Sequence, residues 1–373
     1  MRICVDAREF AANQTTGISR YLQNLLSLLS GQSGPDLTLL VRSADVLPAG
    51  LEHMGPRCIS LPTLPTPVID QILLPRITAR QGAHVFFSPY YKVPLTGRFK
   101  RIITVHDIMF LRLPGLSRIG KLMCSTQLGL AARKADAILV DSEFTRTDLV
   151  SYLPYTADKL RVLHPGLEAA WLEQCDAAAI EQAHARYADG KPFFLYVGNF
   201  KPHKNVDLLV KTFAELDSAG AMQGRCLVLA GGDGKNSERI ARLVTDLGRQ
   251  NTIRIHERVP DSDLKALYAS ADWFVTASEY EGFGYPVAEA MACGCPVICH
   301  PCTSIPEVTG GHSIDIVSLD PEGVSGALQK ALSLSESRRI DMVTQGRAHA
   351  ATFTSKAAAD AFLRVVESLT VSV

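Results

Sequence analysis

The segment Ser278–Ala292 constrains the fold of this chain more than any other stretch of its sequence. It follows a short apolar run, Asp272–Thr276, of the kind that forms a buried parallel strand. Gly282 and Gly284 then precede Pro286, a residue suited to the first position of a helix because its missing N–H needs no partner there. A strand, a glycine loop and a helix in this order indicate an α/β domain that binds ligands at the carboxyl ends of its strands.

The glycine loop is predicted to bind an anion. Glycines let backbone amides approach a ligand closely, and a helix N-terminus offers N–H groups and the positive end of its dipole. Glu281 and Glu289 stand on either side of the loop and the helix start, so both are expected to face the same cleft and to hold hydroxyl groups. The alternative is that Glu289 only complements the helix dipole and that Glu281 is solvated.

The rest of the chain alternates between strand-like and helix-like patterns in two series. In the first series, strands are expected at 2–5, 37–41, 84–87, 102–105, 137–140 and 160–163, and helices at 17–29, 68–80, 117–134 and 143–152. In the second, strands are expected at 192–197, 226–230, 253–255, 273–276 and 297–298, and helices at 206–216, 237–247, 263–268, 322–334, 336–350 and 355–369. Each series predicts a Rossmann-like doubly wound parallel sheet.

Composition limits the classes of protein to which the chain can belong. Its 373 residues suffice for two domains, and 47% hydrophobic with 20% charged residues is typical of soluble globular proteins. No apolar run reaches the roughly 18 residues of a membrane span, and the N-terminus enters a strand directly, so we expect a cytoplasmic protein.

Charge and cysteine content exclude two further classes of partner. A formal net charge of zero argues against nucleic acid as a partner. The cysteines lie mostly in apolar runs, as reduced thiols do, and Cys293, Cys295, Cys299 and Cys302 lack the paired spacing of a zinc site.

The charge is nevertheless unevenly distributed. Residues 1–170 carry 19 of the 38 Lys and Arg but only 13 of the 38 Asp and Glu. Eight basic residues interleave with apolar ones in one segment of this half: Arg98, Lys100, Arg101, Arg112, Arg118, Lys121, Arg133 and Lys134. Such a pattern predicts peripheral contact with an anionic membrane, such as the inner face of the plasma membrane, although a solvated helix face has the same composition.

Further candidate site residues follow other strands. Lys204 precedes the helix expected at 206–216, where the dipole disfavours a cation unless an anion lies nearby, so Lys204 is predicted to bind a diphosphate. Gly17 follows Thr15 and Thr16 and opens the first helix. His106, with Asp107, ends an apolar strand at the edge where such sheets bind ligands.

The motif Glu281-x7-Glu289, with Gly282-Phe283-Gly284 inside it and Glu-Ala-Met-Ala-Cys-Gly-Cys-Pro-Val-Ile following, resembles the retaining glycosyltransferases of the GT-B fold in the large family four. The resemblance implies two Rossmann-like domains facing across a cleft. These are an acceptor-binding domain at 1–168, a domain for the nucleotide sugar at 169–354 and a C-terminal helix at 355–373 that returns to the first domain.

The resemblance also implies roles for individual residues. Lys204, Asn199 and Gly17 are expected at the phosphates of the donor, and Glu289 at its ribose. Glu281 and the amides of Phe283, Gly284 and Tyr285 are expected to orient the donor sugar, and His106 to lie near it. Many members have Arg where this chain has Asn199, so Lys201 and His203 are candidates to replace that charge. No metal and no other cofactor is expected.

The implied activity is transfer of a hexosyl unit from a nucleotide diphosphate sugar to a hydroxyl of a glycan or a lipid-linked saccharide. The opening Val5-Asp6-Ala7-Arg8 and the segment Lys201–Asn205 look most like bacterial mannosyl- or deoxyhexosyltransferases of surface polysaccharide assembly, which favours GDP-mannose as donor. The alternatives are a nucleotide-sugar epimerase of the same fold and a non-catalytic sugar-nucleotide-binding partner. A nicotinamide oxidoreductase is disfavoured because neither glycine loop completes G-x-G-x-x-G.

Overall fold

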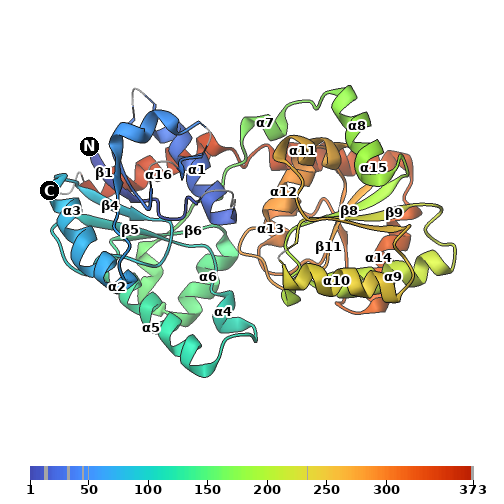
Figure 1. Ribbon diagram of the computed structural model, residues 1–373, viewed down its shortest axis with the longest axis horizontal. Helices are drawn as coiled ribbons and strands as arrows, with labels where there is room; N and C mark the ends of the chain where they lie inside the picture. The colour runs from blue at the N-terminus through green and yellow to red at the C-terminus, as the bar shows by residue number, and fades with distance from the viewer. Residues whose placement is uncertain (12–15, 32–33, 44–45, 49, 233, 371–373) are drawn as a thin grey trace. The chain divides into compact units, whose positions relative to one another are not determined.

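The computed structural model describes residues 1–11, 16–31, 34–43, 46–48, 50–232 and 234–370. The chain divides into two compact units, of which unit 1 comprises Met1–Glu168 and Phe353–Val373 and unit 2 comprises Ala169–Thr352 (Figure 1). Each unit is a wholly parallel sheet covered by helices. The prediction of two Rossmann-like parallel-sheet domains is therefore confirmed.

Unit 1 is built on a seven-stranded sheet. Its strand order is β3 (Cys58–Ser60), β2 (Asp36–Val41), β1 (Arg2–Asp6), β4 (Val85–Ser88), β5 (Lys100–Val105), β6 (Ala137–Val140) and β7 (Leu160–Val162). The chain proceeds outward from β1 to one side and from β4 to the other, so the switch point of the sheet lies between β1 and β4. Ligands bind preferentially at such a point, beyond the carboxyl ends of the strands.

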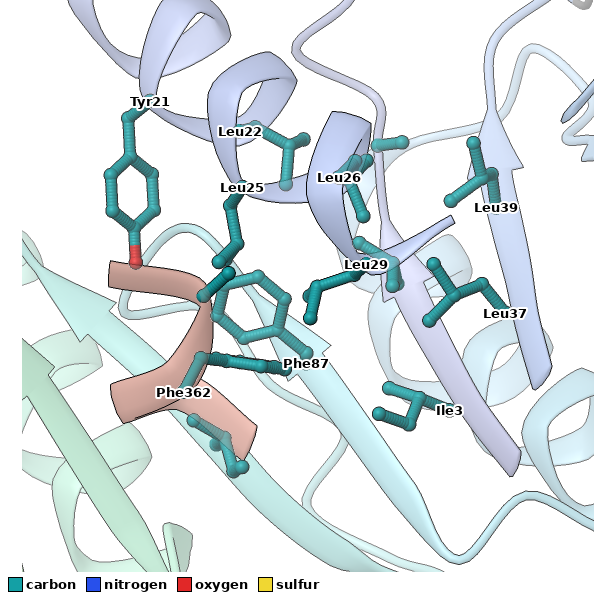
Figure 2. Packing of buried hydrophobic residues seen from close by; sticks show 14 of the residues in the cluster. Ile3, Tyr21, Leu22, Leu25, Leu26, Leu29, Leu37, Leu39, Phe87 and Phe362 are labelled. Carbon is teal, nitrogen blue, oxygen red and sulfur yellow. The ribbon is translucent and has the colours of Figure 1, made fainter. Parts of the chain in front are cut away.

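Two helices cover one face of this sheet, α1 (Gly17–Leu29) and the last helix, α16 (Ser355–Thr370). Side chains alternate along a strand, so Ile3 and Val5 of β1 meet these helices while Cys4 points to the opposite face. Figure 2 shows the leucines of α1 packed toward β1 and β2, with Phe362 of α16 beside Phe87 of β4. The two rings meet edge to face, with their centroids 4.8 Å apart.

The opposite face of the sheet in unit 1 packs on three helices. They are α3 (Leu74–Arg80), α5 (Arg118–Lys134) and α6 (Glu143–Tyr152). Shorter turns join the elements: η2 (Glu52–Arg57), α2 (Thr66–Val68), the π-helical turn η3 (Ile69–Leu73), α4 (Met109–Arg112) and η4 (Pro154–Lys159). Among the described residues, no helix has both the length and the apolarity to cross a bilayer.

Unit 2 is built on a six-stranded sheet. Its order is β10 (Ile253–His256), β9 (Cys226–Ala230), β8 (Phe193–Val197), β11 (Trp273–Thr276), β12 (Val297–Cys299) and β13 (Ile314–Asp315). The switch point lies between β8 and β11, by the same reasoning as in unit 1. The loops that follow these two strands contain Lys204 and the glycine loop of Gly282 and Gly284, both of which the sequence singled out.

The helices of unit 2 form two groups. The helices α9 (Val206–Ser218), α10 (Lys235–Asp246) and α14 (Pro321–Leu332) share a buried core with the sheet. The helices α8 (Ala177–Ala188), α11 (Asp261–Ser270), α12 (Tyr285–Ala292) and α15 (Glu336–Ala350) pack against one another. The shorter elements are α7 (Ala169–Leu172), η5 (Pro202–Lys204) and α13 (Ile305–Thr309).

Apart from short helical turns such as α4, α7 and α13, three elements were missed in the sequence. The edge strands β3 and β13 have three and two residues, too few to show the alternation that identifies a strand. The helix α8 buries only Ala183, Tyr187 and Ala188, so its apolar stripe is weak. The helix α12 begins at Tyr285, one residue earlier than predicted, so Pro286 is its second residue.

Candidate functional site

The loops after β8 and β11 meet at the switch point of unit 2 and bring Lys204 against Glu281. The ammonium Nζ of Lys204 lies 2.5 Å from the carboxylate Oε1 of Glu281, and each side chain is 16% exposed. Further bonds join the two loops: the Asn205 amide donates to the carbonyl of Ala277 at 3.0 Å, and the Glu279 N–H donates to the carbonyl of His203 at 2.8 Å. These hydrogen bonds join the two loops and so fix the backbone positions from which Lys204 and Glu281 form their ion pair.

The backbone explains why Lys204 stands at this place. Lys204 closes the short turn η5, Asn205 follows in the left-handed conformation (φ 51°), and α9 begins at Val206. The position before a helix N-terminus disfavours a cation unless an anion is close. In this structure that anion is the Glu281 carboxylate, which balances the positive charge of Lys204. Another anion that binds Lys204 can take the place of this carboxylate.

Glu281 is fixed by three hydroxyl groups. Ser278 Oγ donates to its carboxylate at 2.7 Å, and Thr303 Oγ1 accepts from its backbone N–H at 3.0 Å. Ser304 Oγ lies 3.0 Å from the carbonyl of Glu281 and 2.9 Å from that of Phe283. Thr303 and Ser304 belong to the loop after β12, for which the sequence predicted no role. The one indication in the sequence was that this loop follows the strand after β11.

Gly284 caps the start of α12. Its φ of 99° lies in the region that side chains rarely adopt, and a Cβ there would stand 2.8 Å from Cδ1 of Ile305. Phe283 before it is buried and contacts the ring of Tyr285 edge to face. Gly282, half-buried, precedes them. The predicted glycine loop thus leads directly into a helix N-terminus, whose dipole favours an anion.

Glu289, which was expected to face a cleft together with Glu281, is buried. It is 1% exposed, and the hydroxyl of Tyr268 on α11 donates to its carboxylate at 3.0 Å. Position 289 lies in the second turn of α12, where the helix packs against α11. The structure therefore keeps one predicted carboxylate, Glu281, partly exposed and buries the other.

The loop after β8 holds the other candidates. Asn199 accepts a bond from the backbone N–H of Lys201 at 3.3 Å through its side chain, and one from the hydroxyl of Tyr196 at 2.6 Å through its carbonyl. Burial, followed by the nearby Lys204 charge, lowers the pKa of His203 to about 4. His203 is therefore neutral at pH 7 and does not replace a missing positive charge, whereas Lys201 is exposed and available for that role.

The next loop, after β9, is packed tightly against this one. A Cβ on Gly231 would lie 2.3 Å from the carbonyl oxygen of Gly198, so the position requires glycine. The glycine at this turn is therefore explained by the close packing of the two backbones, without a role in binding a ligand. Asp233 of the same turn lies outside the described residues.

In unit 1, Gly17 is the first residue of α1. Thr16 caps the helix by a reciprocal pair of bonds with Ser19, and its hydroxyl donates to Glu9 at 2.7 Å. The hydroxyl of Tyr90, which follows β4, donates to the same carboxylate. Glu9 therefore links the segments that follow β1 and β4 at the switch point of unit 1. The sequence did not predict this contact. Thr15 lies outside the described residues.

His106 is paired with Asp141 and not with its neighbour in the sequence, Asp107. Its Nδ1 lies 2.7 Å from the Asp141 carboxylate, and its Nε2 lies 3.0 Å from the carbonyl of Pro89. Both partners only accept hydrogen bonds, so the ring donates from both nitrogens as an imidazolium. Burial opposes that charge, but Asp141 outweighs it and the pKa of His106 is raised above its ordinary value.

The correct partner follows from the register of the sheet. Val105 of β5 stands beside Val140 of β6, so the residues after them, His106 and Asp141, are also neighbours. Asp107 instead accepts from the backbone N–H of Met109 at 2.9 Å, at the start of α4. The sequence placed His106 at the carboxyl edge of the sheet, where it lies, but named no partner for it.

The arrangement in unit 2 is suited to holding a polar anion with attached hydroxyl groups. It offers a lysine, the N-termini of α9 and α12, and a partly exposed carboxylate. All nine cysteines are free thiols. In the part of the chain that the structure describes, no three His, Cys, Asp or Glu side chains are grouped as metal ligands.

Comparison with known families agrees with this chemistry. Residues 179–349 match the model for "Glycosyl transferases group 1", and residues 15–171 match that for "Glycosyltransferase Family 4". O-antigen chain mannosyltransferase B of Escherichia coli is 30% identical over 69% of this chain and 67% of its own length. D-inositol 3-phosphate glycosyltransferase of Corynebacterium jeikeium is 30% identical over 63% of this chain and 58% of its own length. The serotype-specific mannosyltransferase WbdA of Escherichia coli is 29% identical over 63% of this chain but only 29% of its own length.

Solved structures show the same fold at low identity. A sucrose-phosphate synthase from Thermosynechococcus elongatus aligns over the whole of both chains with a TM-score of 0.79 and 19% identity. Anabaena Alr3699/HepE in complex with UDP and glucose aligns over 99% of this chain and all of its own, with a TM-score of 0.78 and 16% identity. Together with the two family matches, these likenesses show that the chain belongs to the group 1 glycosyltransferases and has the GT-B fold.

Proposed function

We propose that this glycosyltransferase moves a hexosyl unit from a nucleotide diphosphate sugar to a hydroxyl of a glycan or a lipid-linked saccharide, with retention at the anomeric carbon. The observation that carries the proposal is the ion pair of Lys204 and Glu281 at the switch point of unit 2. A diphosphate that binds Lys204 takes the place of the Glu281 carboxylate and leaves it to accept bonds from sugar hydroxyls.

In the proposed reaction, the bond between the anomeric carbon and the diphosphate oxygen breaks while the acceptor oxygen bonds to the same carbon. The proton of the acceptor hydroxyl passes to the departing phosphate on the same face of the sugar. Lys204 and the N-termini of α9 and α12 stabilise the charge that grows on the diphosphate. In this scheme no metal ion and no other cofactor is required.

The other candidates take supporting roles in this proposal. Glu289 holds the ribose hydroxyls, and its contact with Tyr268 fixes the orientation of the carboxylate. Gly17 brings backbone amides to the diphosphate, and Asn199 lies in the loop that carries Lys204. His106, as an imidazolium, donates to a hydroxyl of the transferred sugar in place of the Pro89 carbonyl.

GDP-mannose is the proposed donor, and surface polysaccharide assembly the proposed setting. Two relatives near 30% identity support both, since they are described as an O-antigen chain mannosyltransferase and a serotype-specific mannosyltransferase. The rival donors are UDP and dTDP sugars, and UDP-glucose is bound by a protein of the same fold.

A thermal-shift screen with GDP-mannose, UDP-glucose and a dTDP sugar tests the donor. At 100 times the Kd, a ligand adds about 2.7 kcal/mol to the stability of the folded state, which is readily seen as a rise in Tm. The variant Lys204→Ala should lose this shift, whereas Lys330→Ala, an exposed lysine on α14, should keep it. If none of the three donors raised the Tm of the wild-type chain, the proposal would be overturned.

The metal-independent scheme is tested by measuring sugar transfer in excess EDTA, where activity should be retained.

We also propose peripheral contact with an anionic membrane through α5. Several of the basic residues named above are already engaged: Arg101 is buried, Lys100 pairs with Asp136, and Arg112 pairs with Asp148. What remains is an apolar face at the start of α5, where Ile119, Leu122 and Met123 are 72%, 66% and 67% exposed. Arg118 and Lys121 flank these side chains, as in helices that lie in a membrane interface.

Sedimentation with vesicles tests this contact. Binding to vesicles rich in phosphatidylglycerol should fall strongly in Leu122→Asp, because a charge replaces an inserted apolar side chain. The matched control is Ile340→Asp, which changes an exposed isoleucine on α15. Equal sedimentation of the wild-type chain with anionic and neutral vesicles, or of both variants with anionic ones, would exclude α5 as the contact.

A further inference from the structure

Thr303 has an unusual backbone for its side chain. Its φ of 51° lies in the left-handed region, which a β-branched residue adopts rarely and under strain. Among the described residues, only three other non-glycine residues share this region: Asp189, Asn205 and Gln223. Asn205 is one of the residue types that tolerate it, so Thr303 is the more demanding case.

Asn205 and Thr303 attach to the same loop from two sides. Asn205, from the loop after β8, donates to the carbonyl of Ala277, and Thr303, from the loop after β12, accepts from the N–H of Glu281. The segment from Ala277 to Glu281 is thus held by both neighbouring loops. A strained conformation that persists at such a junction needs compensation by the contacts it makes.

The hydroxyl of Thr303 also begins a chain of contacts that returns to the Glu281 carboxylate. It donates to Sγ of Cys302 at 3.7 Å, the Cys302 thiol donates to the carbonyl of Ser278 at 3.1 Å, and Ser278 Oγ donates to Glu281 Oε1 at 2.7 Å. Burial raises the pKa of Cys302 to about 11, so this thiol remains protonated and able to donate at neutral pH.

We propose that Thr303, assisted by Ser304, is a positioning residue that fixes the main chain of Glu281 so that only its carboxylate moves when a diphosphate binds Lys204. This inference rests on the proposed function for its consequence in catalysis. The buried Ser304 holds the carbonyl side of Glu281 and Thr303 holds its N–H, so the two hydroxyls clamp one residue at both of its backbone polar groups. The carboxylate of Glu281 is held separately, by Lys204 Nζ and Ser278 Oγ.

Three substitutions of Thr303 separate the hydroxyl from the backbone. Thr303→Ser keeps the hydroxyl, Thr303→Val keeps the shape without it, and Thr303→Gly removes both the hydroxyl and the strain. We expect Thr303→Val to lower kcat by about tenfold with a donor KM within about threefold of the wild type, which corresponds to the loss of one hydrogen bond. Thr303→Ser should stay within about twofold in both.

Stability should move differently from activity. Thr303→Gly should unfold at the same Tm as the wild type or higher, because glycine adopts this φ freely, and yet lose kcat as Thr303→Val does. A purely structural role would make kcat follow Tm across the three variants, and that result would overturn the proposal. Thr212→Val is the matched control, because Thr212 is buried on α9 and its hydroxyl has no hydrogen-bond partner among the described residues.

Hydrogen exchange without ligand tests the clamp independently of any activity. The amide of Glu281 should exchange at least about tenfold faster in Thr303→Val than in the wild type, and at an unchanged rate in Thr303→Ser. Equal protection in all variants would refute the positioning role, even if the chain transfers sugar. Faster exchange in a chain that binds no sugar nucleotide would support the clamp and contradict only the proposed function.

Discussion

Lys204 and Glu281 are 77 residues apart in the sequence, and their contact depends on β8 and β11 being neighbours in the sheet. The same holds for His106 and Asp141, which follow β5 and β6. The sequence placed Lys204, Glu281 and His106 beyond the carboxyl ends of strands, but it did not single out Asp141. It did not identify the partner, because strand order is decided by long-range packing.

The pair of His106 and Asp141 predicts how stability depends on pH. The pKa of His106 is raised in the folded state, so folding favours the protonated ring. The stabilisation is complete below the pKa of the unfolded chain, near 6.5, and is lost as pH rises through the raised pKa of the folded state. We therefore expect His106→Gln to cost about 2 kcal/mol at pH 5.5 and distinctly less at pH 9.

Urea unfolding of the two proteins at a series of pH values measures this difference. His53→Gln is the control, since His53 is an exposed residue of η2. A cost of His106→Gln that is constant with pH, or that grows as pH rises, would show that the ring is neutral in the folded protein.

At the scale of single elements, the loop from Ala277 to Gly284 and the helix α12 act together. The helix needs a residue with positive φ before Tyr285, and a Cβ there would stand 2.8 Å from Cδ1 of Ile305 on α13, so that this side chain would have to shift. The sequence predicted the loop and the helix from glycine and proline alone. It did not reveal that α13 packs against Gly284, or that the loop after β12 fixes Glu281.

Gly284→Ala should therefore destabilise unit 2 by about 1–3 kcal/mol through backbone strain, in addition to the contact with Ile305. Gly326→Ala is the matched control, because Gly326 lies in α14 with no atom near its missing Cβ. There alanine should stabilise the helix by about 0.5–1 kcal/mol. Chemical denaturation of both variants measures the effects, and equal stability of the two would contradict this account of the loop.

At the scale of the whole molecule, the first and last parts of the chain form one unit. Phe362, Val366 and Ala358 of α16 lie in the core that α1 and β1 build (Figure 2). We therefore expect unit 1 to need the C-terminal helix for a stable fold, although unit 2 lies between its two parts in the sequence.

Phe362→Ala should cost unit 1 about 3–5 kcal/mol, since it empties a fully buried site beside Phe87. Both tryptophans, Trp171 and Trp273, belong to unit 2. Unfolding followed by circular dichroism should therefore show an earlier transition, while the transition seen by tryptophan fluorescence stays in place. Arg364→Ala, an exposed change on the same helix, should alter neither. A fluorescence transition that shifts equally would mean that the units unfold together.

The sequence by itself determined the two parallel sheets, because buried strands and amphipathic helices have periods that can be read locally. It also located the candidate residues at the carboxyl ends of strands, since glycine, proline and charged residues interrupt those patterns there. Its misses were short or weakly patterned: β3, β13 and α8 have too few buried side chains to show a period.

Only the tertiary structure decided which of those residues meet. It paired Lys204 with Glu281 and His106 with Asp141, buried Glu289 against Tyr268, and brought Thr303 and Ser304 to the backbone of Glu281. The physical reason is that such contacts join loops from different strands, and which loops are neighbours depends on the order and register of the whole sheet.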